Sequence, residues 1–114
     1  MKYKALFIIF ALFFFISAAY HLVAVFVSVN ESPVWRNLLF VGINAFTGYF
    51  LLKRPRWFIW FFILLMFQQL YSHGSDLINA WNSQHRIDWM SLMVILVMPA
   101  IYIFLLIDRT AKQN

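Results

Sequence analysis

The chain alternates between long apolar runs and short polar breaks. Four runs stand out, at residues 5–29, 34–52, 57–73 and 89–107. Each is close to the roughly 20 residues that cross a hydrocarbon core about 30 Å thick. A bilayer core offers no water to unpaired backbone groups, and the runs lack the alternation of barrel strands, so helices are expected. The pattern predicts an all-α membrane protein, a single four-transmembrane-helix bundle over residues 1–114.

The breaks carry residues that start and stop helices. Ser32 is expected to cap the second helix, with Pro33 in its first turn. Pro55 should end the second helix and open the third, and Asp88 should cap the fourth. Pro99 lies within the fourth run, where it predicts either a kink or a proline that a membrane helix simply tolerates.

Residues 74–87 form the one sizeable polar segment between runs. Leu77, Ile78 and Trp81 share a helical face there. This pattern is consistent with a short interfacial helix on the outer leaflet or with a lid over the bundle, and a connecting segment without a further role is favoured.

Composition supports lipid as the main solvent. The chain is 64% hydrophobic and 11% charged, against about 25% charged residues in soluble domains. There is no cysteine, which excludes disulfides, thiolate metal sites and cysteine nucleophiles. The net charge of +5 comes from residues that flank the apolar runs, so no nucleic acid partner is expected. No nucleotide-binding loop, serine elbow or carboxylate pair is found, and an enzyme is not expected.

The basic residues predict the orientation. Two of them, Arg36 and Arg86, fall on one side of a four-span arrangement, and seven fall on the other: Lys2, Lys4, Lys53, Arg54, Arg56, Arg109 and Lys112. The positive-inside rule then places both termini in the cytoplasm of a multi-pass protein, which we expect in a bacterial-type inner membrane. One alternative concerns residues 1–19, which resemble a secretory signal peptide ending at Ser17-Ala18-Ala19. Because the apolar run continues to Val29, a retained span is favoured.

Polar side chains inside the runs indicate where function could lie. His21 follows Lys4 by 17 residues and His73 follows Arg56 by 17, so both would lie about 26 Å above the inner basic residues. Polar residues near the level of the two histidines predict a polar chamber in the outer third of the bundle. Its predicted ligand-binding residues are Ser17, His21, Asn44, Gln69, Tyr71 and His73.

Several functions fit such a chamber. The leading prediction is a non-catalytic protein that binds a small apolar ligand, such as a quinone or lipid, or a membrane protein partner. The alternative is a redox or metal-handling component with His21 and His73 as ligands of haem iron or of copper. Four methionines (Met66, Met90, Met93 and Met98) could complete a copper site, although methionine in a span is usually packing.

Three further interpretations stay open. Histidine suits proton-linked transport, although no acidic residue lies at the midplane. The chain could be an accessory subunit of a larger complex, or a homo-oligomer. In the simplest case the polar groups only hold helices together through hydrogen bonds.

Overall fold

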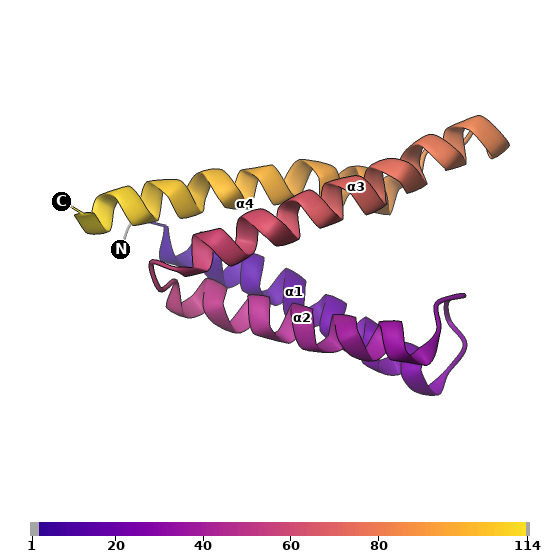
Figure 1. Cartoon of the computed structure of the whole chain (residues 1–114), viewed down its shortest axis with the longest axis horizontal. Helices are drawn as coiled ribbons and strands as arrows, with labels where there is room; N and C mark the ends of the chain where they lie inside the picture. The colour runs from indigo at the N-terminus through magenta and orange to yellow at the C-terminus, as the bar shows by residue number, and fades with distance from the viewer. Residues whose placement is uncertain (1–2, 114) are drawn as a thin grey trace. The chain divides into compact units, whose positions relative to one another are not determined.

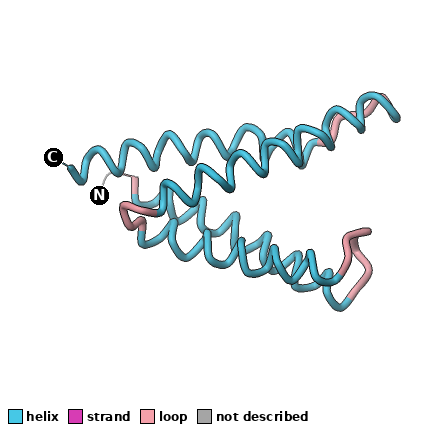
Figure 2. The backbone as a smooth tube through the Cα atoms, viewed as in Figure 1, coloured by secondary structure: helices cyan, strands magenta, loops and turns pink. Residues whose placement is uncertain are grey.

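The computed structural model describes residues 3–113, and Lys2 of the charge count lies outside them. The described residues form four helices and no strand: α1 (Lys4–Phe26), α2 (Val34–Lys53), α3 (Phe58–Gln84) and α4 (Trp89–Gln113). The all-helical prediction is therefore confirmed. The helices pair in chain order, α1 with α2 and α3 with α4 (Figure 1). These pairs make two compact units, Met1–Pro55 and Arg56–Asn114, each a hairpin closed by a loop (Figure 2).

The first unit packs an apolar stripe of α1 beside a polar and small-residue stripe of α2. The buried side chains of α1 recur at helical spacing from Phe7 onward: Phe7, Ala11, Phe14, Ala18 and Ala24. Those of α2 are Asn37, Asn44, Thr47, Gly48 and Leu51. Gly48 lets the two helices approach, because a β-carbon built there would lie 2.9 Å from the Phe15 ring.

The exposed face of α2 is mainly apolar, which is the reverse of a helix in a water-soluble protein. Apart from Arg36 and Lys53 near its two ends, its large exposed side chains are apolar or aromatic: Val34, Trp35, Leu38, Leu39, Phe46, Tyr49 and Leu52. Its buried face carries two asparagines and a threonine. A soluble helix buries its apolar stripe and exposes its polar one, so α2 has the opposite amphipathicity.

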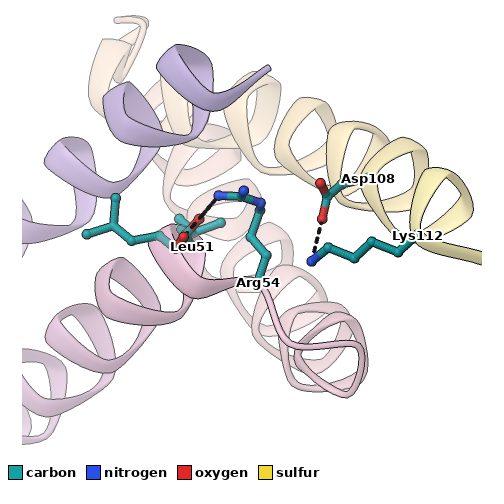
Figure 3. A network of polar contacts seen from close by, with 5 residues as sticks. Leu51, Arg54, Asp108 and Lys112 are labelled. Atoms are coloured by element: carbon teal, nitrogen blue, oxygen red, sulfur yellow. Dashed lines mark hydrogen bonds and ion pairs between the residues drawn. The ribbon is translucent and has the colours of Figure 1, made fainter. Parts of the chain in front are cut away.

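Arg54 stabilises the C-terminal end of α2, which lies away from the loop between α1 and α2. Arg54 ends α2 in the left-handed conformation, with φ 51°. Its guanidinium donates hydrogen bonds of 3.1 Å to the carbonyls of Leu51 and Leu52 (Figure 3 labels Arg54 and Leu51). The guanidinium also lies 4.5 Å from the ring centre of Phe7. Orphan carbonyls at the helix end are satisfied in this way, and the cation contacts a buried ring of α1.

The second unit has a regular buried stripe on α4. Its members alternate three and four residues apart: Ser91, Val94, Met98, Ile101, Leu105 and Asp108. Such spacing is typical of two helices packed along a shallow crossing. Near the C-terminal end, Asp108 pairs with Lys112 at 3.1 Å, and the Arg109 guanidinium lies 5.6 Å from the ring centre of Trp60 (Figure 3 shows the Asp108–Lys112 pair).

Some predicted boundaries are wrong. The third helix does not stop at residue 73, since α3 continues to Gln84 and includes most of the segment expected to form a separate interfacial helix. No proline interrupts this stretch, and a single glycine at position 74 costs a helix only about 1 kcal/mol. Similarly, α4 continues beyond residue 107 to Gln113, since the Asp108–Lys112 pair supports its last turn.

Two other corrections concern the first loop. α1 ends at Phe26 and not at residue 29, because Val27 takes an extended conformation from which the loop turns. Pro33, and not Ser32, occupies the capping position of α2, where its carbonyl accepts hydrogen bonds from the N–H groups of Arg36 and Asn37 at 3.1 and 3.2 Å. Among the described residues, two helices, α1 and α4, are long and apolar enough to cross a membrane.

Candidate functional site

A network of side-chain amides joins the two helices of the first unit at their loop end. Asn37 of α2 is 1% exposed and faces Asn30 of the connecting loop. Their amides pair reciprocally, each nitrogen donating to the other oxygen at 3.2 Å. Asn37 also donates to the carbonyl of Ser32 at 3.4 Å, and its oxygen lies 2.9 Å from Nδ1 of His21 on α1. The network therefore binds α1, the loop and α2 to one another.

Both asparagines have used their full hydrogen-bonding capacity. An amide side chain offers two donor hydrogens and two acceptor lone pairs. Asn37 donates to Asn30 and Ser32, and accepts from Asn30 and His21. Asn30 donates to Asn37 and to the hydroxyl oxygen of Tyr20 at 3.4 Å, and accepts from Asn37 and from the N–H of Ser32 at 3.1 Å. The amide pair thus has no remaining group for a ligand.

The hydrogen bond to Asn37 determines which tautomer the neutral imidazole of His21 adopts. The oxygen of Asn37 can only accept, so Nδ1 of His21 carries the hydrogen that it donates. In the neutral imidazole, Nε2 is then the acceptor. The groups of the network that still have hydrogen-bonding capacity are Nε2 of His21 and the hydroxyl hydrogen of Tyr20, which is about half exposed.

Aromatic rings and one cation border His21. Its imidazole stacks on Phe40 of α2 with ring centres 5.3 Å apart, and the Tyr20 ring meets it edge-on at 5.2 Å. The guanidinium of Arg36 lies 5.7 Å from the centre of the same Phe40 ring. The exposed edge of this cluster therefore combines apolar surface, an imidazole, a phenol and a positive charge.

The second unit holds His73 in a chain of three polar groups. Nδ1 of His73 on α3 lies 3.0 Å from the hydroxyl of Ser91, which is buried in the first turn of α4. That hydroxyl donates to Asp88 at 2.8 Å, and the N–H of Ser91 donates to the other oxygen of Asp88 at 3.2 Å. Asp88 therefore caps α4, as the sequence predicts, and the cap is connected to α3 through a serine.

The carboxyl of Asp88 has a lowered pKa. Desolvation alone would raise it, but the two hydrogen bonds from Ser91 and the positive charges of Arg86 and His73 favour the ionised form and outweigh burial. The folded hairpin is therefore more stable when the Asp88 side chain is ionised than when it is protonated.

The order of these groups differs from that of a serine hydrolase. In a catalytic triad the histidine lies between the serine and the carboxylate and takes the serine proton. Here the serine lies between His73 and Asp88 and gives its proton to the carboxylate. Its oxygen consequently accepts from His73, and the arrangement does not activate Ser91 as a nucleophile.

The remaining predicted ligand residues have other surroundings. Asn44 donates to the carbonyl of Phe40 in its own helix at 2.8 Å, and Ser17 is half-buried on α1. Gln69 donates to its neighbour Gln68 at 2.6 Å, and Tyr71 is 80% exposed. His21 and His73 lie in different units, each held by a partner from its own helix pair.

Sequence reasoning did not include the main partners of the two histidines in the predicted site. Asn37 belongs to the polar stripe of the second run, and Ser91 is the main polar residue at the start of the fourth, so both were visible as signals. Asn30 carries no such signal, since it lies in a loop. Among residues 3–113, no group of three or more His, Cys, Asp or Glu side chains is placed to hold a metal ion.

Comparisons with protein-family models, with curated proteins and with solved structures give no match for this chain.

Proposed function

We propose that this chain is a four-span membrane protein, with both termini in the cytoplasm, that binds a small amphiphilic ligand through His21 near the outer face. The proposed location is the inner membrane of a bacterium, and the proposed role is non-catalytic. The observation that carries the proposal is the saturated Asn30–Asn37 pair, which holds His21 in one tautomer with Nε2 as an acceptor.

The reversed amphipathicity of α2 supports lipid as its surroundings. Its asparagines and threonine are buried, whereas most of its leucines and several of its aromatic residues are exposed. In water, that arrangement would leave a large apolar surface uncovered. In a bilayer it is favourable, because lipid covers the apolar face and each polar group finds a partner inside the protein.

Helix length and pairing support four spans in place of two. α1 and α4 each satisfy the requirements for a span by themselves. α2 has 20 residues, about 30 Å of helix, and packs along α1, so it covers a similar depth. α3 has 27 residues and packs along α4 in the same way.

A network built only for stability would leave no group without a partner. The amides of Asn30 and Asn37 meet that condition, but Nε2 of His21 and the hydroxyl hydrogen of Tyr20 do not. A ligand headgroup that hydrogen-bonds these two atoms, with its apolar part in the bilayer, would complete the network.

The proposal is tested by the amphiphiles that the protein retains. We expect native mass spectrometry of protein saturated with a bacterial lipid extract to show one bound amphiphile, and His21→Ala to reduce its occupancy about tenfold. His85→Ala is the matched control, because His85 is exposed in the second unit, and it should leave occupancy unchanged. Equal retention by wild type and His21→Ala would reject a ligand site at His21.

Metal or haem handling is the second candidate function, because each histidine has its Nδ1 hydrogen engaged by a neighbour. Metal-ligating histidines donate their other ring N–H to an oxygen, as His21 does to Asn37 and His73 does to Ser91. A Soret band, or copper or iron bound in stoichiometric amount and lost in His21→Ala, would favour this function over amphiphile binding.

A further inference from the structure

Arg36 is a cation for which the fold provides no anion. It occupies the first turn of α2, where the positive end of the helix dipole makes a cation unfavourable. Its guanidinium is exposed and contacts the ring of Phe40, but it makes no ion pair or hydrogen bond within residues 3–113. Nothing in the packing of the first unit explains a positive charge at this position.

The position of Arg36 relates it to the site at His21. Phe40 lies against both groups, with the imidazole stacked on its ring and the guanidinium over the same ring. The hydroxyl of Tyr20 is also available there, since its oxygen accepts from Asn30 and its hydrogen remains to be donated. The Arg36 guanidinium and the Tyr20 hydroxyl are hydrogen-bond donors that can each bind a further acceptor. They indicate a ligand that is rich in oxygen and negatively charged.

His21 lies beside these donors. Its ring centre is 5.2 Å from that of Tyr20 and 5.3 Å from that of Phe40, and its Nδ1 hydrogen is committed to Asn37. Three charged or titratable residues belong to this part of the first unit: Tyr20 of α1, Glu31 of the loop between Asn30 and Ser32, and Arg36 of α2. Of these, only Glu31 opposes an anion.

Building on the function proposed above, we infer that the amphiphile bound at His21 has an anionic phosphate or carboxylate headgroup, held by the Arg36 guanidinium and the Tyr20 hydroxyl beside the imidazole. On the four-span arrangement, His21 is 17 residues beyond Lys4, about 26 Å up the span, at the level of the outer headgroups. The ligand's chains then lie along the exposed apolar side chains of the first unit.

The inference is tested with two lipids that differ only in the headgroup. Native mass spectrometry would compare phosphatidylglycerol with a diacylglycerol that has the same chains. We expect about tenfold higher occupancy of the anionic lipid, and loss of this preference in Arg36→Gln. Arg86→Gln, which removes a cation from the second unit, is the matched control and should keep the preference, whereas Glu31→Gln should increase it.

The outcomes separate this inference from the proposed function. Equal occupancy by the two lipids, with both lost in His21→Ala, would overturn the anionic headgroup and keep the site. No dependence on His21 for either lipid would overturn both. If free glycerol phosphate displaces phosphatidylglycerol, the anion is recognised by its phosphate from solution. If it does not, the membrane lipid is the ligand, and in either case the anionic chemistry is supported.

Discussion

Replacing Asn37 with alanine is expected to lower the free energy of unfolding by about 2–4 kcal/mol. The change removes four hydrogen bonds, and it leaves Asn30 and Nδ1 of His21 without their buried partner. Each group left unsatisfied costs about 1–3 kcal/mol, with values near 1 kcal/mol measured inside membranes. The loss should appear in denaturation of the detergent-solubilised protein followed by circular dichroism.

Asn82→Ala is the control for this measurement, because Asn82 is an exposed amide on α3. It should change stability by less than about 0.5 kcal/mol. If the two variants were equally stable, the network around Asn37 could not be what holds α1 to α2 at the loop end.

The second large effect is expected for Ser91→Ala, at about 2 kcal/mol. Alanine keeps the backbone N–H that donates to Asp88, but it removes the hydroxyl that joins Asp88 to His73. The part-buried hydrogen bond of His73 to the hydroxyl, and the one that a carboxylate oxygen of Asp88 accepts from it, are then lost. Thermal unfolding at neutral pH should show the loss, and Ser83→Ala on the exposed face of α3 serves as the control.

Ser91→Ala is also expected to change how the stability of the protein depends on pH. Because the pKa of Asp88 is lowered in the folded protein, its stabilisation is complete above about pH 4, where unfolded aspartates ionise, and is lost as pH falls through the lowered value. The wild type should therefore lose stability below about pH 4. In Ser91→Ala this loss should be smaller, and an unchanged acid dependence would contradict the role assigned to the hydroxyl.

The helices themselves could be predicted from the sequence, but their ends only in part. Apolar runs of about 20 residues without strand alternation predicted helices, in which every backbone group has a partner. The end of an apolar run marks a change of solvent, however, and a helix can continue beyond it. This is why α3 continues past Gly74 to Gln84, and why α4 continues through Asp108 to Gln113.

The contacts of the candidate site were harder to predict. The sequence places His21 and Asn37 on polar stripes, but their pairing depends on how the loop from Val27 to Pro33 turns. Asn30 has its role only because that turn brings its amide opposite Asn37. Equal depth predicted a chamber that His21 and His73 share. Within its own unit each histidine has a hydrogen-bond partner on the neighbouring helix, and helical period alone does not encode that register.

The most direct test of the account is to determine on which side of the membrane each turn lies. The chain contains no cysteine, so single cysteines at Ser32, Arg56, Ser83 and Thr110 report without background. In intact cells a membrane-impermeant maleimide should label positions 32 and 83 and should reach 56 and 110 only after the membrane is opened. Labelling of position 56 from outside, or a folded protein that needs neither lipid nor detergent, would contradict four spans surrounded by lipid.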